Sequence, residues 1–464
     1  MTIWSQALIV LLIVWVLARL IKRRTPLLQR YFIPSSIIGG ILLLLIGPQL
    51  MQIIPGPMTS YLSSMPALLI NIVFAGLFIG RAIPGIRKIW DQSGPMIAYG
   101  NTTAWGMYVL GIALVLTVLG PVFGAPNIFG SLLEISFTGG HGTAAGLAPV
   151  FRELGSPGGT TLALGLATFS IVTSVIVGII IINIYNRRTG RLLDRATMKY
   201  QQNQMIKNGY SLTKFTHRLE TNPREIITAI SLLAMAIGVG WLILHGLVWS
   251  ENSLLDGVTD FRVFGHLPLF PLAMFGGLIV QIILKRLHLS NLVNLNTIQV
   301  ICSIALDLLI VTAIGTMSLN VIAHNFATFS ILAITGALWV IFMLLFVAPK
   351  MFRKHWFEYG MTDFGQAMGT TATGLLMNRL VDPMNRTGAR EAFAYKQLAF
   401  EAFMGGGIFT AVSAVLIVEW GIIQFFILAI AMFCFWLTVG LILGAKRSRR
   451  RNRRTLLGSL SLRL

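Results

Sequence analysis

The sequence predicts an all-α polytopic membrane protein with about eleven transmembrane helices. Of its 464 residues, 55% are hydrophobic and 11% are charged, whereas soluble proteins carry about 25% charged residues. The mean hydropathy is +0.77, and several apolar runs reach the roughly 20 residues that a transmembrane helix needs. This composition excludes a soluble enzyme, a disordered chain and a disulfide-stapled scaffold.

The formal net charge of +20 would suggest a nucleic-acid partner in a soluble protein. Here the basic residues lie in short segments between apolar runs, where they set orientation in the bilayer, so no nucleic-acid partner is expected. The only cysteines, Cys302 and Cys434, lie in separate apolar runs. They predict neither a disulfide nor a metal site, and no cofactor is expected.

Eleven apolar segments have the length and composition of transmembrane helices. Basic residues follow the first segment instead of preceding it, which is the reverse of a cleavable signal peptide, so we expect this helix to be retained. The expected helices cover residues 2–20, 36–54, 66–80, 95–119, 160–184, 225–248, 268–284, 297–317, 327–348, 398–418 and 421–445.

The charges between these helices agree with a single orientation in the cell membrane. Alternate segments carry clusters of Lys and Arg, while residues 55–65 carry no charge and residues 250–266 are mainly acidic. Because basic segments stay on the cytoplasmic side, we expect the N-terminus outside and the C-terminus inside.

A long hydrophilic stretch divides the chain into two membrane halves. We expect an N-terminal half at 1–185, a basic cytoplasmic linker at 186–224, a C-terminal half at 225–420, an additional helix at 421–445 and a basic cytoplasmic tail at 446–464. Each half has five crossings, an odd number, so the second half enters the membrane from the opposite face. This arrangement is an inverted repeat.

Two weak sequence matches recur in the same order in both halves. A proline precedes a glycine pair by five residues at 34–40 and again at 271–277. A Gly/Thr-rich segment at 137–147 matches 364–375 with a gap of one residue. Co-linear matches of this kind are typical of transporters built from internal repeats.

The Gly/Thr-rich segments are expected to lie in re-entrant loops, at 121–159 and 360–378. Both stretches are rich in residues that weaken a helix, yet both are too apolar for an ordinary surface loop. Non-helical backbone is tolerated at membrane depth only where protein or a water-filled cavity covers it. We therefore expect the loops to enter from opposite faces and to form a ligand site.

The loop residues expected to bind a substrate offer backbone amides, hydroxyls or positive charge. Glycine lets the backbone approach a ligand closely, and short helices that start at the loops direct their positive ends toward an anion. The alternative for the glycines is ordinary helix packing, and for the arginine it is an orientation charge. The expected residues are Gly139, Gly140, His141, Gly142, Thr143, Gly365, Gly369, Thr370, Thr371, Thr373 and Arg379.

Three further polar residues in apolar segments are candidates for binding a cation. Asp307 could ligate a cation or carry a proton, or could be satisfied by a neighbouring helix. Asn101 and Asn325 open the fourth predicted crossing of each half, where their amide oxygens suit a hard cation or a hydrogen bond between helices. We find no catalytic or metal-ligating constellation and do not expect an enzyme.

The segment from Gly139 to Thr143, its partner at 364–375, the five-plus-five layout and the central linker resemble the bacterial sodium/glutamate symporters over roughly residues 1–420. The resemblance implies sodium-coupled uptake of an amino-acid anion such as glutamate, a site formed by the re-entrant loops, and a homodimer with elevator-like movement. It also implies that the cation candidates bind sodium. A proton- or sodium-coupled dicarboxylate transporter and, less readily, a passive channel are the alternatives.

Overall fold

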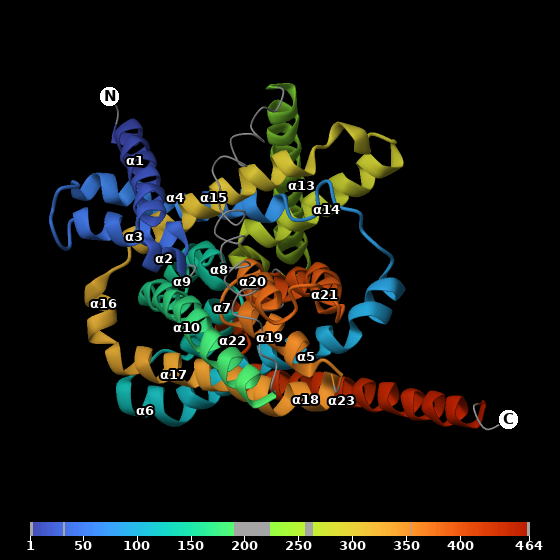
Figure 1. The fold of residues 1–464 in the computed structure, drawn as a ribbon. Helices are drawn as coiled ribbons and strands as arrows, with labels where there is room; N and C mark the ends of the chain where they lie inside the picture. Colours follow the sequence, from blue (N-terminus) through green and yellow to red (C-terminus); the bar gives the residue numbers. More distant parts are fainter. Residues whose placement is uncertain (1–2, 31–32, 190–222, 256–262, 353, 462–464) are drawn as a thin grey trace.

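The computed structural model describes residues 3–30, 33–189, 223–255, 263–352 and 354–461, and this part of the chain is helical without strands (Figure 1). Ten of its helical segments are long and apolar enough to cross a membrane. The predicted fold class is therefore confirmed. Of the predicted linker at 186–224, only residues 186–189 and 223–224 belong to the described residues.

The helices fall into an early and a late set along the chain. The early set is α1 (Ile3–Arg24), α2 (Pro26–Arg30), α3 (Ser35–Ile46), α4 (Gly56–Ala75), α5 (Ile86–Leu114), α6 (Gly120–Phe123), α7 (Leu132–Phe137), α8 (Gly140–Gly146), α9 (Ala148–Glu153) and α10 (Gly158–Thr189). The late set is α13 (Pro223–Leu255), α14 (Leu269–Arg286), α15 (Leu295–Gly315), α16 (Leu319–His324), α17 (Phe326–Phe342), α18 (Ala348–Phe352), α19 (Trp356–Ala367), α20 (Thr371–Val381), α21 (Ala389–Phe403), α22 (Ile408–Glu419) and α23 (Ile422–Ser461).

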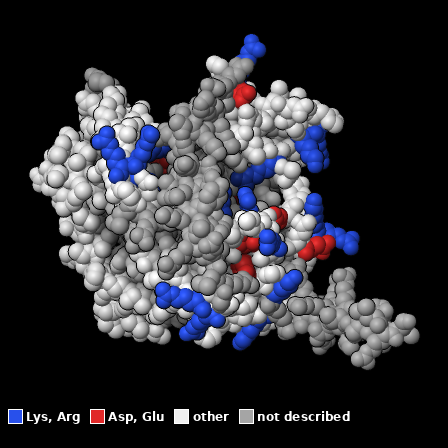
Figure 2. All heavy atoms as spheres, viewed as in Figure 1, with Lys and Arg blue, Asp and Glu red and all other residues white. Residues whose placement is uncertain are grey.

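In space the helices form two groups (Figure 1). The six-helix group consists of α1, α3, α4, α13, α14 and α15, which pack against one another around two apolar clusters of their own. The site group consists of α5, α7 to α10 and α17 to α23, and it contains most of the largest apolar core. The short helix α16 links the groups on one side, and α8 contacts both α4 and α15. On the face drawn in Figure 2, Lys and Arg side chains outnumber Asp and Glu.

Two predicted crossings are interrupted or shortened. Helix α3 has 12 residues, about 18 Å at 1.5 Å per residue, and ends before Gly47-Pro48 because proline disfavours the helical conformation of the residue before it. The predicted crossing at 398–418 is divided into α21 and α22 by a break at 404–407. Gly405 and Gly406 adopt φ values of 66° and 103° there, which glycine tolerates and other residues rarely adopt.

Two predicted helix starts are wrong because prolines lie inside the helices. The predictions placed starts at Pro66 and Pro95, whereas α4 begins ten residues earlier at Gly56 and α5 nine residues earlier at Ile86. Proline removes one backbone hydrogen bond, but membrane helices tolerate it where neighbouring helices and side chains satisfy the freed groups.

A π-helical segment follows α5 and another follows α17, a parallel that the sequence analysis did not detect. The segments cover Val115–Leu119 and Met343–Val347, and each ends two residues before a proline, Pro121 or Pro349. A proline inside a helix lacks the amide donor and clashes with the carbonyl four residues earlier. A π turn accommodates such a disturbance without ending the helix.

The second glycine of each Pro-x4-Gly-Gly motif, Gly40 or Gly277, allows close helix packing between the early and late sets. A Cβ atom on Gly40 of α3 would lie 2.5 Å from Cβ of Ile314 on α15. Conversely, a Cβ atom on Gly277 of α14 would overlap the carbonyl oxygen of Ala75 on α4. Helix α3 thus packs on α15 as α14 packs on α4, and only a residue without a side chain fits at either contact.

The preceding glycine of each pair also approaches the first helix of its own set. A Cβ atom on Gly39 would lie 2.9 Å from Cγ2 of Val311 on α15 and 3.3 Å from Cβ of Ala18 on α1. One on Gly276 would overlap the carbonyl oxygen of Ala236 on α13. The two Pro-x4-Gly-Gly motifs therefore share a contact with the first helix of their own set, although Gly39 lies closer to α15.

We predict that Gly277→Ala lowers the unfolding free energy by about 1–3 kcal/mol, the usual penalty for overpacking a core. The added methyl group would push α14 away from the backbone of α4. The matched control is Gly238→Ala in α13, where nothing lies within 4 Å of the added atom and alanine favours the helix. Thermal unfolding in detergent measures both; equal midpoints for Gly277→Ala and the unaltered protein would contradict the close packing.

Candidate functional site

The first Gly/Thr-rich segment forms a break between α7 and α8. The helices are separated at Thr138 and Gly139, and Gly140 has a φ of 70°. The Thr143 hydroxyl donates a hydrogen bond to the Gly139 carbonyl over 3.0 Å. The interruption follows from the glycines, because a residue with a Cβ atom disfavours this left-handed conformation.

The second Gly/Thr-rich segment forms a break between α19 and α20, at residues 368–370. Thr370 has an extended backbone and caps α20, since its hydroxyl accepts a hydrogen bond from the Thr373 amide over 3.3 Å. The Thr370 and Thr373 hydroxyls are also 3.2 Å apart. A threonine at this position satisfies one of the amides that a helix start leaves without a partner.

These two breaks meet the third one, at 404–407, in the centre of the fold (Figure 1). A Cβ atom on Gly140 would lie 3.3 Å from the Gly369 carbonyl oxygen. A Cβ atom on Gly406 would lie 2.5 Å from the Thr143 hydroxyl. Three interrupted helix pairs thus converge, and we call this region the junction.

Glu134 of α7 holds the first and third breaks together. Its side chain is fully buried and accepts hydrogen bonds from the Tyr108 hydroxyl over 2.8 Å, the Thr410 hydroxyl over 2.9 Å and the Gly405 amide over 3.0 Å. Burying a carboxylate is expensive unless donors surround it. An acidic residue in an apolar segment is a signal from which this role could have been predicted.

A buried ion pair adjoins the first and second breaks. Lys396 Nζ of α21 lies 3.0 Å from Oδ1 of Asp363 on α19, and the two side chains are 0% and 1% exposed. Lys396 also donates to the Gln366 Oε1 atom over 2.9 Å, and Gln366 Nε2 donates to the Thr138 carbonyl over 3.5 Å. The sequence did not reveal this pair, because Asp363 lies in the expected re-entrant loop at 360–378 and Lys396 in the connection that follows it.

The start of α20 has a second acidic neighbour. The Glu401 Oε1 atom accepts hydrogen bonds from the Thr371 hydroxyl over 2.6 Å and from Gln397 Nε2 over 2.8 Å. Together with Glu134 and Asp363, Glu401 makes the junction rich in carboxyl groups. Of the Lys and Arg side chains that the structure describes, only Lys396 is buried.

Of the predicted loop residues, His141 is buried beside the first break. Its Nε2 atom is 2.9 Å from the Thr168 hydroxyl of α10, and no hydrogen-bond partner reaches Nδ1 within the described residues. Gly142 and Gly365 serve as packing positions. Added Cβ atoms would lie 2.9 Å from Ile70 of α4 and 2.7 Å from the Thr373 carbonyl, respectively.

Two charged residues predicted to bind solutes, Arg379 and Asp307, make no hydrogen bond to the breaks within the described part of the chain. Arg379 is exposed on α20, about two helical turns beyond Thr371. Asp307 of α15 is paired with Arg19 of α1 over 2.8 Å and lies 3.4 Å from the indole nitrogen of Trp15. The structure therefore places Asp307 in a contact between helices of the six-helix group.

The two predicted asparagines occupy different environments. Asn101 is buried in the middle of α5, because that helix begins at Ile86, and its amide donates to the Ile97 carbonyl over 2.9 Å. Asn325 lies between α16 and α17 and donates to the Val321 carbonyl over 2.9 Å. Only Asn325 opens a helix, so the predicted correspondence between the two residues is wrong.

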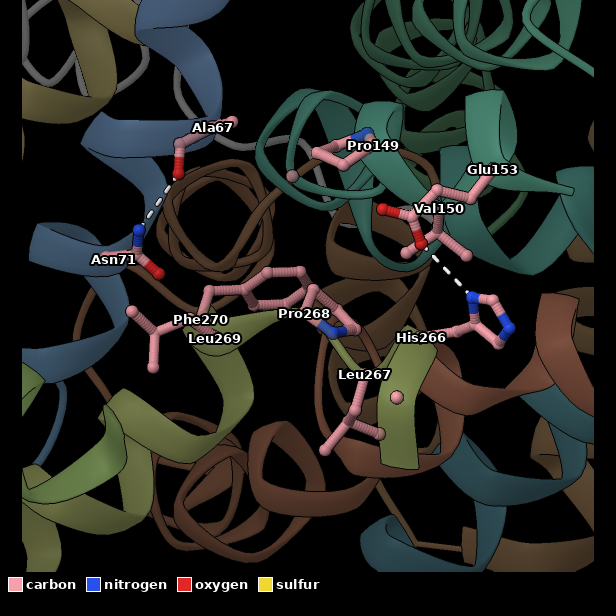
Figure 3. A pocket seen from close by; sticks show the side chains of 12 residues that line it. Ala67, Asn71, Pro149, Val150, Glu153, His266, Leu267, Pro268, Leu269 and Phe270 are labelled. Carbon is pink, nitrogen blue, oxygen red and sulfur yellow. Dashed lines mark hydrogen bonds and ion pairs between the residues drawn. The ribbon is translucent and has the colours of Figure 1, made fainter. Parts of the chain in front are cut away.

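A separate cavity of about 230 Å³ lies between the two helix groups (Figure 3). Its wall includes Asn71 of α4, Gly146 at the end of α8 and Phe270 of α14. At one edge, His266 Nδ1 lies 3.1 Å from the Glu153 carboxylate. The cavity therefore marks the boundary between the groups and not the junction itself.

A sequence profile of the sodium/glutamate symporter family matches residues 3–376, most of the chain. The chain belongs to this family. It is therefore a secondary transporter and not an enzyme. The match includes the first two breaks and Asp363, whereas Lys396 and the third break follow the matched residues. No curated protein matches this family member in a sequence comparison.

We predict that Glu134→Gln destabilises this symporter by about 1–3 kcal/mol, because one of the two acceptor oxygens of Glu134 is lost. The amide nitrogen of glutamine cannot accept a hydrogen bond, and each buried donor left unpaired costs about 1–3 kcal/mol. Tyr108→Phe removes one donor and should have a smaller effect. Thermal unfolding measures both variants against Glu419→Gln, a control at an exposed end of α22. An unfolding midpoint for Glu134→Gln equal to that of the control would refute the role of Glu134.

Proposed function

We propose that this symporter couples sodium entry to the uptake of glutamate or a similar amino-acid anion, and that both solutes bind at the junction. The observation that carries the proposal is the approach of Gly140 to the Gly369 carbonyl, which joins the two Gly/Thr-rich breaks. Backbone groups freed by a broken helix are available to a ligand only where the surrounding protein excludes lipid. The family match supports the choice of sodium and glutamate.

The two halves are, in this proposal, inverted repeats, and each sends one broken helix pair into the membrane from its own side. The corresponding contacts of Gly40 and Gly277 and the π turns before Pro121 and Pro349 support this relation. A pseudo-two-fold axis in the membrane plane places the junction near the middle of the bilayer. The proposed orientation has the N-terminus outside and the C-terminus in the cytoplasm of the cell.

The charge of the junction gives a physical reason for coupling. Three carboxyl groups, those of Glu134, Asp363 and Glu401, lie at the junction, whereas Lys396 supplies the one buried ammonium group among the described residues. An anion that enters such a site alone meets repulsion in a poorly screened environment. Sodium ions that bind first remove this repulsion, while the Thr370 cap and the first amides of α20 offer donors to a carboxylate.

The movement that we propose displaces the site group along the six-helix group, with the latter forming the contact of a homodimer. Helix α8 is the main contact between the groups, and its glycines Gly142 and Gly146 face Ile70 and Phe270. Contacts between glycine and apolar side chains contain no hydrogen bonds that must be broken during sliding. This interface therefore supports an elevator-like displacement.

Purified protein in liposomes tests the proposed function. An inward sodium gradient should cause accumulation of labelled glutamate above equilibrium, and an inside-negative potential should increase it if more than one sodium ion accompanies each anion. Each net charge moved across 100 mV contributes about 2.3 kcal/mol. Accumulation that persists when choline replaces sodium, or that follows dicarboxylates and not glutamate, would contradict the proposal in favour of the proton-coupled or dicarboxylate alternative. Flux without accumulation would favour a channel.

We predict that Gly140→Ala lowers sodium-driven uptake at least several-fold. The substitution places a methyl group against the Gly369 carbonyl and imposes a φ of 70° on alanine, at a cost of about 1–2 kcal/mol. The control is Gly155→Ala, because Gly155 has the same φ of 70° with nothing within 4 Å of the added atom. Equal uptake by the two variants, at equal amounts of folded protein, would show that transport does not depend on the contact between the breaks.

A further inference from the structure

The buried pair of Lys396 and Asp363 is not explained by transport of an anion or by the stability of the helices alone. Both side chains are almost completely buried, and removing an ammonium and a carboxylate from water costs several kcal/mol for each ion. The charges also lie within one hydrogen-bond chain of the first break, through Gln366 and the Thr138 carbonyl. A functional role beside the proposed substrate site would explain why this costly buried pair is present.

The surroundings of the ammonium resemble a binding site for a monovalent cation. Its neighbours are the Asp363 Oδ1 atom at 3.0 Å, the Gln366 Oε1 atom at 2.9 Å and the face of the Phe400 ring at 3.7 Å. Carboxylate and amide oxygens are the ligands that hard cations prefer, and an aromatic face also attracts a cation. The site is thus built around a positive charge, and Lys396 supplies that charge.

Asp363 retains unused capacity to bind a cation. Its Oδ1 atom is paired with the Lys396 ammonium at 3.0 Å, whereas no hydrogen-bond donor among the described residues reaches Oδ2. Gly100 of α5 provides the space for the pair. A Cβ atom there would lie 2.5 Å from Lys396 Cε and 3.4 Å from Asp363 Oδ1.

We propose that Lys396 is a tethered cation that permanently occupies a sodium site formed by Asp363 and Gln366. The protein itself then neutralises one carboxylate of the junction, and the transport cycle needs one coupling ion fewer there. The inference rests on the proposed sodium coupling. It adds that removal of the ammonium exposes a new sodium site, whose ligands are the Asp363 carboxylate and the Gln366 amide oxygen.

The test uses the purified full-length protein without substrate. Thermal unfolding is recorded at increasing sodium chloride, with choline chloride holding the ionic strength constant. A ligand that binds the folded state raises the unfolding midpoint in proportion to its occupancy. Lys396→Met should gain a sodium-dependent rise that exceeds the rise of the unaltered protein. The double variant Asp363→Asn with Lys396→Met should lose this gain because it lacks the carboxylate.

The matched control is Lys350→Met, which removes an ammonium from an exposed position of α18 and should respond to sodium as the unaltered protein does. If Lys396→Met is unfolded in choline, the yield of folded protein after extraction in sodium is measured instead. Recovery in sodium supports the proposal. An identical sodium response in Lys396→Met and the unaltered protein, or failure to fold in both salts while the double variant folds, overturns it.

The sodium dependence of unfolding and the liposome uptake test different claims. Absence of sodium-driven uptake by the unaltered protein would remove the proposed function, whatever the unfolding data show. Normal uptake by the unaltered protein together with no gained sodium response in Lys396→Met would leave the proposed function intact and reject only the tethered cation.

Discussion

An interrupted helix inside a membrane must have its free backbone groups covered by protein, because lipid offers them no hydrogen bonds. This constraint explains why the breaks after α7, α19 and α21 lie together. Each supplies groups that the others cover, as the contact of Gly140 with the Gly369 carbonyl shows. The Glu134 carboxylate then joins α5, α7 and α22 around them. A site of polar backbone results.

The same requirement for close backbone approach extends to the six-helix group. Gly40 and Gly277 let α3 and α14 approach α15 and α4 until no side chain fits between them. Such contacts replace the hydrophobic effect, which does not drive helix association within lipid. Close packing therefore holds the six-helix group together with the Arg19–Asp307 ion pair, whereas a network of buried hydrogen bonds and charges holds the junction in the site group. This difference fits the displacement of the site group along the six-helix group that we propose.

The sequence predicted the fold class and the helix interruptions in the two Gly/Thr-rich segments, because composition and helix-weakening glycines are local signals. Entry of these segments as re-entrant loops from opposite faces stays a prediction. Sequence-based prediction failed where the decisive interaction joins distant residues. Lys396 and Asp363 are 33 positions apart, and nothing in either segment indicates that they pair. The contact of Asp307 with Arg19, 288 positions away, was likewise not visible in either segment, and cation binding by Asp307 stays a prediction. The break at 404–407 could have been anticipated, because three consecutive glycines interrupt an apolar run there.

The central claim is that the breaks form one binding site, and a cryo-electron microscopy map of the purified protein in sodium and glutamate tests it most directly. We expect density for the solute between the segments containing Thr143 and Thr373, with both breaks lining it. Well-defined solute density elsewhere, for example in the cavity beside Asn71 and His266, would contradict it.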